Sequence, residues 1–148
     1  MTFFSSLLEG LGKELNTKLA PDARGNCVIN FLDKFDVYIQ PARNEQILVC
    51  CSIGVVPPGA FREKLLKSAL IANGFPPPHK GVLAYSEDAD SLVLFEHLHT
   101  EGLNAKKLYD YIQDFNGKIT IWRDAIESGE IPSAFRENSF KGTGPFGM

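Results

Sequence analysis

Cys27-Val-Ile-Asn-Phe31, Phe35-Asp-Val-Tyr-Ile-Gln40 and Gln46-Ile-Leu-Val-Cys-Cys-Ser-Ile53 are the three stretches that decide the fold. In the first two, core-type apolar residues occupy every second position, which is the period of a half-buried strand. The third is apolar on both faces, so we expect it to be covered on both sides and to be the central strand of a sheet. Short turns at 33–34 and 41–44 separate the three strands.

A helical pattern precedes these strands. From Phe4 to Leu19 the apolar side chains recur at steps of three and four, which predicts one amphipathic helix. Ser5 or Ser6 is a candidate N-cap. Gly10 and Gly12 each weaken such a helix by roughly 1 kcal/mol relative to Ala. The helix therefore depends on packing to persist.

Two more helices are expected after the strands. The first runs from Pro58 to a stop at Asn73-Gly74 and shows more than one apolar face, as a helix between a sheet and a second subunit would. The last begins after the N-cap Asn104, carries an apolar stripe over 108–126 and ends at Gly129. The β-branched run at 119–121 leaves a strand there as an alternative.

Between these helices, 82–86 and 91–98 predict a hairpin closed by the acidic turn 87–90. The element order is therefore αβββαββα. We expect a single α+β domain over residues 1–132, with a twisted, mainly antiparallel sheet packed by helices. Residues 133–148 carry several glycines and no period, so we expect a flexible C-terminal tail.

Composition narrows the class of partner. The 148 residues carry a formal net charge of −3 with the basic residues scattered, which argues against nucleic acid. The longest apolar runs, such as 47–51, are far too short to span a bilayer. No basic residue precedes the apolar N-terminus, so we expect a cytoplasmic protein without a secretory signal.

No arrangement of residues predicts catalysis. Cys27, Cys50 and Cys51 lack the spacing of a metal site and are expected to be small buried hydrophobes in a reducing compartment. His97 and His99 share one strand face and form a possible metal pair without an evident third ligand. No nucleophile lies near a base in the sequence pattern. We therefore expect no catalytic residue, metal or cofactor.

The same residues resemble a known family. The element order and several segments are similar to class I chaperones of bacterial type III secretion, the CesT/SycE-like (Tir chaperone) family, with the closest likeness among chlamydial members. The resemblance covers residues 3 to 131. The segments that carry it are Phe4–Gly12, Cys27–Ile39, Gln46–Val56, Val82–Tyr85, Leu92–Phe95 and Trp122–Ile126. The proline run at 76–78 and the glycine-bearing tail depart from the pattern.

The resemblance implies a function carried by surfaces. Members are small acidic dimers of the bacterial cytoplasm that hold the chaperone-binding segment of a secreted effector or gatekeeper protein in extended, export-competent form. No enzymatic activity, ATP or metal is implied. The dimer would be a homodimer or a heterodimer with a related chaperone. A strand edge beside an apolar helix suits this role, because an extended peptide can add by main-chain pairing.

The resemblance also implies two sets of site residues, both expectations. The partner-binding groove would use residues of the first helix and outward residues of the first strands: Leu7, Leu8, Leu11, Leu15, Val28, Asn30, Val37 and Ile39. The dimer interface would use Leu66, Leu70, Leu83 and Tyr85. The leucines of the first helix could instead belong to the core. The alternative function is a small α/β enzyme or a ligand-binding regulatory domain that uses the His97/His99 strand face.

Overall fold

The computed structural model describes residues 2–77 and 79–135. Its order matches the expected αβββαββα, followed by one short 3-10 helix. The elements are α1 (Phe3–Leu15), β1 (Cys27–Phe31), β2 (Phe35–Ala42), β3 (Gln46–Val55), α2 (Ala60–Asn73), β4 (Val82–Ser86), β5 (Ser91–His99), α3 (Ala105–Ser128) and η1 (Ser133–Phe135). Within the described ranges, none of the helices is both long and apolar enough to cross a membrane.

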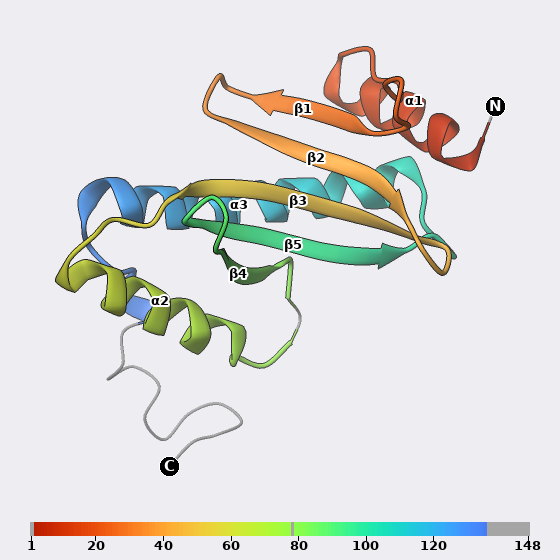
Figure 1. Ribbon diagram of the computed structural model, residues 1–148. Helices are drawn as coiled ribbons and strands as arrows, with labels where there is room; N and C mark the ends of the chain where they lie inside the picture. The colour runs from red at the N-terminus through yellow and green to blue at the C-terminus, as the bar shows by residue number, and fades with distance from the viewer. Residues whose placement is uncertain (1, 78, 136–148) are drawn as a thin grey trace.

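The five strands form one antiparallel sheet in the order β1-β2-β3-β5-β4 (Figure 1). β3 is the middle strand, as expected from its apolar sequence. β1 and β4 are the two edges. The turn into β2 places Leu32 and Asp33 at φ values of 56° and 55°, and the turn into β3 does the same with Asn44 and Glu45. Paired positive φ values match the twist of a tight hairpin.

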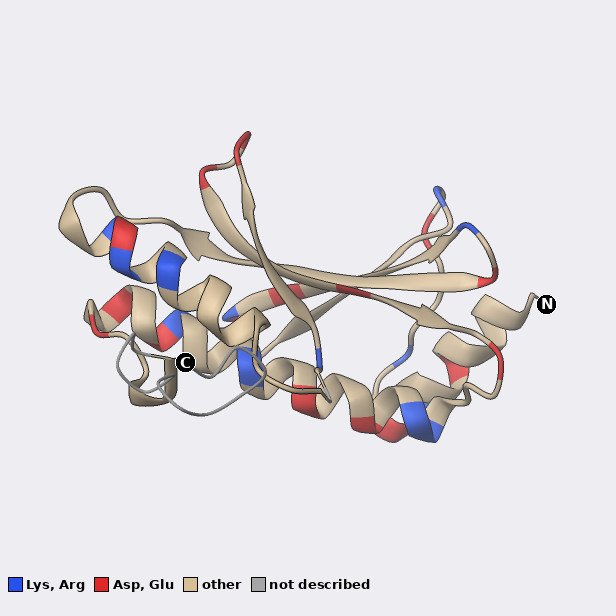
Figure 2. Ribbon diagram, turned by 90° about the horizontal axis from the view of Figure 1, so that it is seen from below, with Lys and Arg blue, Asp and Glu red and all other residues tan. Residues whose placement is uncertain are grey.

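The core lies between the sheet and the helices, which share one side of it (Figure 2). Alternate strand residues such as Ile29, Val37 and Val49 point into this layer and are buried. From α3 the expected stripe meets them, with Leu108, Ile112, Phe115, Ile119 and Trp122 all fully buried. α1 packs against α3 at the end of the sheet that β1 and β2 occupy (Figure 1).

Within the described chain, helices cover only one face of β3, so the cover expected on its second face stays a prediction. Ile47, Val49 and Cys51 are buried under the helices. Leu48 and Cys50, on the opposite face, are only half-buried, and no helix lies over them (Figure 2). In a strand, successive side chains point to opposite faces of the sheet. A sequence that is apolar at every position therefore predicts two apolar faces, but it does not show which element covers each face.

α1 is shorter than predicted. Asn16 adopts a left-handed conformation at φ 57°, and Thr17 N–H donates to Gly12 C=O at 2.9 Å, so the helix ends at Leu15 rather than Leu19. Gly12 allows this turn, because a Cβ there would lie 2.4 Å from the Thr17 oxygen. The N-cap is Thr2, and neither predicted serine takes that role.

The other helix ends follow the sequence more closely. Asn104 caps α3 by accepting a hydrogen bond from Lys107 N–H at 2.9 Å, and Gly129 ends it at φ 74°. The strand considered at 119–121 is helical. α2 ends at Asn73 as predicted, but it begins after Gly59, so Pro58 precedes the helix and is not in its first turn.

The chain beyond α3 returns to the body. Ser133–Phe135 form the 3-10 helix η1, and the Phe135 ring stacks on Trp122 with centroids 5.4 Å apart. Phe135 also packs on Phe75 at 5.3 Å. The predicted tail from 133 therefore begins with three residues held by the fold. Residues 136–148 lie outside the described residues, so the flexibility expected for them stays a prediction.

Candidate partner-binding surfaces

The face of the sheet opposite the helices, here called the bare face, carries apolar side chains that no other element of the described chain covers. We define it by its apolar members, which come from all five strands: Val28, Tyr38, Leu48, Cys50, Val82, Ala84, Val93 and Phe95. Three of them, Val28, Tyr38 and Val82, are 40–46% exposed. Large apolar patches on a soluble protein mark places where another molecule binds. Asn30 Nδ2 donates to Asp36 Oδ1 at 2.8 Å on the same face.

The β1 edge borders this face. Among the described residues β1 pairs only with β2, so its other side presents main-chain N–H and C=O groups that no strand takes up. Leu32, in the turn that ends β1, has a φ of 56°, and its side chain is 83% exposed. An edge with free backbone groups is a template for an added strand.

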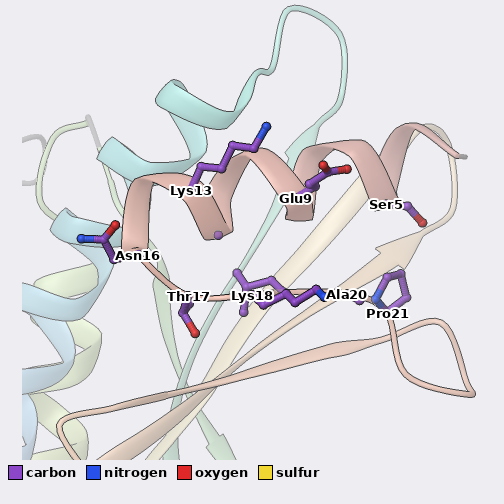
Figure 3. Close-up of a pocket in the computed structure, with 10 residues that line it drawn as sticks. Ser5, Glu9, Lys13, Asn16, Thr17, Lys18, Ala20 and Pro21 are labelled. Carbon is purple, nitrogen blue, oxygen red and sulfur yellow. The ribbon is translucent and has the colours of Figure 1, made fainter.

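A groove of about 820 Å³ lies between α1 and the segment 16–21 that runs back beside it (Figure 3). Ser5, Glu9 and Lys13 line it from the helix side (Figure 3). Leu19 and the rest of the extended segment line the other side. Its walls combine apolar surface with one acidic and two basic side chains, which suits a peptide rather than a single small ion.

The leucines assigned to partner binding do not lie in this groove. Leu7, Leu8 and Leu11 are buried in the core of the single chain, at 4%, 0% and 0% exposure. Leu15 is half-buried at the end of α1. The first three leucines are therefore core residues, and a glutamate at Leu8 or Leu11 would place an unpaired carboxylate in an apolar core.

The strand residues of the same set divide between two faces. Val28 and Asn30 are exposed on the bare face, as expected. Val37 and Ile39 are fully buried beneath the sheet, so their assignment as outward residues is wrong. The register explains the error, since Val28 pairs with Tyr38 while Ile29 pairs with Val37. A shift of one residue along a strand reverses the face.

The residues predicted to form the dimer interface also differ in solvent exposure. Leu70 is 72% exposed on α2, Tyr85 is 44% exposed on β4, and Leu66 is half-buried. Leu83 is buried at 4% exposure and faces the core. Its side chain is therefore part of the core, and an arginine at this position would bury an unpaired charge.

A polar network joins α2 to the β4–β5 hairpin. The Arg62 guanidinium donates to Asp90 Oδ1 and to Tyr85 Oη at 3.1 Å, and the Tyr85 hydroxyl donates to Asp90 at 2.6 Å. The Tyr85 and Arg62 hydrogen bonds lower the pKa of Asp90 below its ordinary value. Arg62 also donates to Val56 C=O at 3.1 Å. This network holds the hairpin turn against the start of α2.

A second polar cluster, which sequence reasoning missed, lies under the sheet. Glu96 accepts hydrogen bonds from Tyr111 Oη at 2.5 Å and from Gly81 N–H at 2.8 Å, while Lys118 Nζ donates to Gly81 C=O at 2.8 Å. Burial raises the pKa of Tyr111, with Glu96 adding to the rise, and burial lowers the pKa of Lys118. The one available signal was a charged residue at a core-facing strand position.

The histidine and cysteine residues form no site in the described chain. His97 and His99 are exposed on the bare face, and His99 Nε2 lies 3.5 Å from Gln46 Nε2. Within residues 2–77 and 79–135, no three His, Cys, Asp or Glu side chains are grouped to hold a metal. Burial raises the pKa of Cys51 to about 12, which keeps its thiol protonated and unreactive near neutral pH.

The fold and these surfaces define a binding module in which one layer of helices supports an open sheet. The sequence matches the model of the Tir chaperone protein (CesT) family over residues 6–123. The chain belongs to this family. The family is named for a chaperone, which is a non-enzymatic role. No curated protein matches the sequence significantly.

Solved structures with a similar fold include a secretion chaperone, a chaperone-effector complex and a type III secretion complex. One is the Yersinia pestis type III secretion chaperone SycH with a fragment of YscM2, at TM-score 0.65 and 19% identity, covering 79% of this chain and 97% of that one. A second is from the HopA1-SchA chaperone-effector complex, at TM-score 0.65 and 20% identity, covering 83% and 94%. A third is from the ExoU-SpcU complex of Pseudomonas aeruginosa, at TM-score 0.63 and 13% identity. The match covers 82% of this chain and 98% of that one.

Proposed function

We propose that this protein is a cytoplasmic type III secretion chaperone that binds an extended segment of a secreted effector or gatekeeper protein and keeps it competent for export. Family membership carries the proposal. The similar chains solved in a chaperone-effector complex and with a fragment of YscM2 support it. The open β1 edge and the bare face supply surfaces of the required kind. The role needs no chemistry, so we propose that the protein is not an enzyme.

The partner segment would pair along β1 and lay alternate side chains on the bare face. Main-chain hydrogen bonds to an edge strand provide affinity, and side-chain contacts every second residue provide selectivity. Val28 and Asn30 are placed to touch such a segment, and the groove beside α1 would take its continuation. Leu15 lies at the margin of this region, while Leu7, Leu8 and Leu11 would act from below by holding α1 in place.

We further propose a dimer formed through α2 and β4. Leu70 and Tyr85 offer exposed apolar surface there, and Leu66 adds a partly covered neighbour. Leu70 is 72% exposed, while α2 packs on the fold through the buried residues Leu65, Ala69 and Ala72. Val37 and Ile39 would support the sheet rather than touch a partner. A second copy of this chain and a related chaperone would both bind through Leu66, Leu70 and Tyr85.

Binding to defined peptides tests the function. Overlapping peptides covering the type III secreted proteins of the source organism would be titrated by fluorescence anisotropy. We expect Val28→Lys to weaken binding by about tenfold or more, because a charge on the bare face next to the edge opposes strand addition. Ile121→Lys, at a similarly exposed apolar position on α3, is the matched control. Failure of the unaltered protein to bind any peptide would refute the proposal.

A further inference from the structure

The β4 edge differs from the β1 edge in what its main chain contacts. In an antiparallel pair, residues alternate between those whose N–H and C=O face the neighbouring strand and those that face away. Leu83 stands opposite Leu94 of β5, yet both of its backbone polar groups bond elsewhere. These groups therefore point outward, along the free edge of the sheet.

Asn73 occupies these outward groups. It is the last residue of α2, and its Oδ1 accepts from Leu83 N–H at 3.0 Å while its Nδ2 donates to Leu83 C=O at 2.7 Å. A carboxamide presents one acceptor and one donor side by side, as the backbone of a paired strand residue does. One side chain of a helix thus takes the position that a residue of a sixth strand would fill.

The residues on either side leave little edge exposed. Gly81, just before β4, has its N–H held by Glu96 and its C=O held by Lys118. Its φ of 110° and a Cβ position 2.8 Å from Leu94 restrict this place to glycine. Tyr85, two residues after Leu83, is the next residue with outward groups, and the hairpin turn follows at once. A single open residue is too short to template a strand.

We propose that Asn73 closes the β4 edge to strand addition and thereby determines which edge of the sheet a partner strand can use. The inference rests on the proposed function in assigning the open β1 edge to the secreted segment, and on the proposed dimer through α2 and β4. It adds that contacts between subunits along α2 and β4 are made by side chains and not by a sheet continuing from one copy into the next. The strand that Asn73 prevents from pairing with this edge is β4 of a second copy of the chain.

Amide hydrogen exchange at Leu83 tests the closure directly. In the full chain carrying Asn73→Ala, we expect the Leu83 amide to exchange about tenfold or more faster, since its only acceptor is removed. Alanine favours the helix more than asparagine, so α2 should persist. Lys64→Ala, on an exposed turn of the same helix, is the control and should leave the exchange rate unchanged. An unaltered Leu83 rate in Asn73→Ala would overturn the proposal.

Sedimentation velocity tests the consequence, with the protein itself as the probe. Asn73→Ala should form species larger than those of the unaltered protein at equal concentration, because the freed edge pairs between copies. Adding Val82→Lys should return the size to that of the unaltered protein while Leu83 exchange stays fast. An Asn73→Ala protein that sediments as the unaltered one does would contradict the role in edge selection. Both readouts use the chain alone, so they stand apart from any failure to bind secreted peptides.

Discussion

Gly10 of α1 and Ala105 of α3 approach so closely that a Cβ built on Gly10 would lie 2.6 Å from the Cβ of Ala105. That distance is far below a van der Waals contact, so only glycine lets the two helices meet at this point. The residue that weakens α1 as an isolated helix is thus the residue that fastens it to the body of the protein.

Gly10→Ala should therefore lower stability even though alanine favours helices. We expect a loss of about 1–3 kcal/mol from overpacking, against a propensity gain of roughly 1 kcal/mol. Gly117→Ala is the matched control, because a Cβ on this glycine of α3 has nothing within 4 Å. It should raise stability by up to ~1 kcal/mol. Urea unfolding of both variants checks the prediction, and equal signs for the two would contradict it.

Substitutions at Leu83 and Leu70 test folding and dimer formation separately. Leu83→Arg should destabilise the chain by ~3 kcal/mol or more, because it buries an unpaired charge. Leu70→Arg lies on exposed surface and should change stability by less than ~0.5 kcal/mol, while shifting the proposed dimer toward monomer. Thermal unfolding and sedimentation equilibrium measure the two effects. A Leu70→Arg protein that is as dimeric as the unaltered one would remove α2 from the interface.

Trp122 provides a built-in report on η1. It is the one tryptophan of the sequence, it is fully buried, and Phe135 stacks on it with an interplanar angle of 19°. Phe135→Ala should shift its fluorescence emission to longer wavelength and cost about 1–3 kcal/mol, less than a fully buried Phe. Phe3→Ala, which removes a 53% exposed ring at the other end of the chain, should leave the emission unchanged. Identical spectra for Phe135→Ala and the unaltered protein would show that η1 does not cover the indole.

Acid should weaken the hairpin network through Asp90. Hydrogen bonds from Tyr85 and Arg62 hold its folded pKa below the unfolded value of about 3.9. The stability that the carboxylate supplies is therefore complete above about pH 4 and is lost as the pH falls through the folded pKa. The melting temperature of Asp90→Asn should fall less between pH 7 and pH 3 than that of the unaltered protein. Asp88→Asn, in the same turn but outside the network, should follow the unaltered protein instead.

The order of helices and strands was predictable because the spacing of apolar residues depends only on neighbouring positions in the sequence. The alternation in β1 and β2 and the long stripe of α3 survive in the structure almost unchanged. The end of α1 was not predictable in this way. Leu19 continues the helical spacing, yet the chain turns at Asn16 and brings Leu19 back to the margin of the core by another route.

The site was less accessible to sequence reasoning than the fold. Periodicity shows that Leu8 and Val37 share an apolar face with their neighbours, but burial depends on which element covers that face. The hydrogen bonds of Asn73 and Glu96 join positions ten and fifteen residues apart in the chain, and no local pattern encodes them. The inference that surfaces rather than a catalytic cluster carry the function came from the family resemblance and the lack of a nucleophile with a base.

The one-sided helix layer has a consequence for how such proteins diverge. Outward strand residues such as Val28 and Tyr38 lie outside the layer between sheet and helices, so they can change with little effect on the packing of that layer. The three solved structures named above share 20% identity or less with this chain and still superpose at TM-scores of 0.63–0.65. A scaffold of this kind can therefore change the chemistry of its open face while its fold is kept.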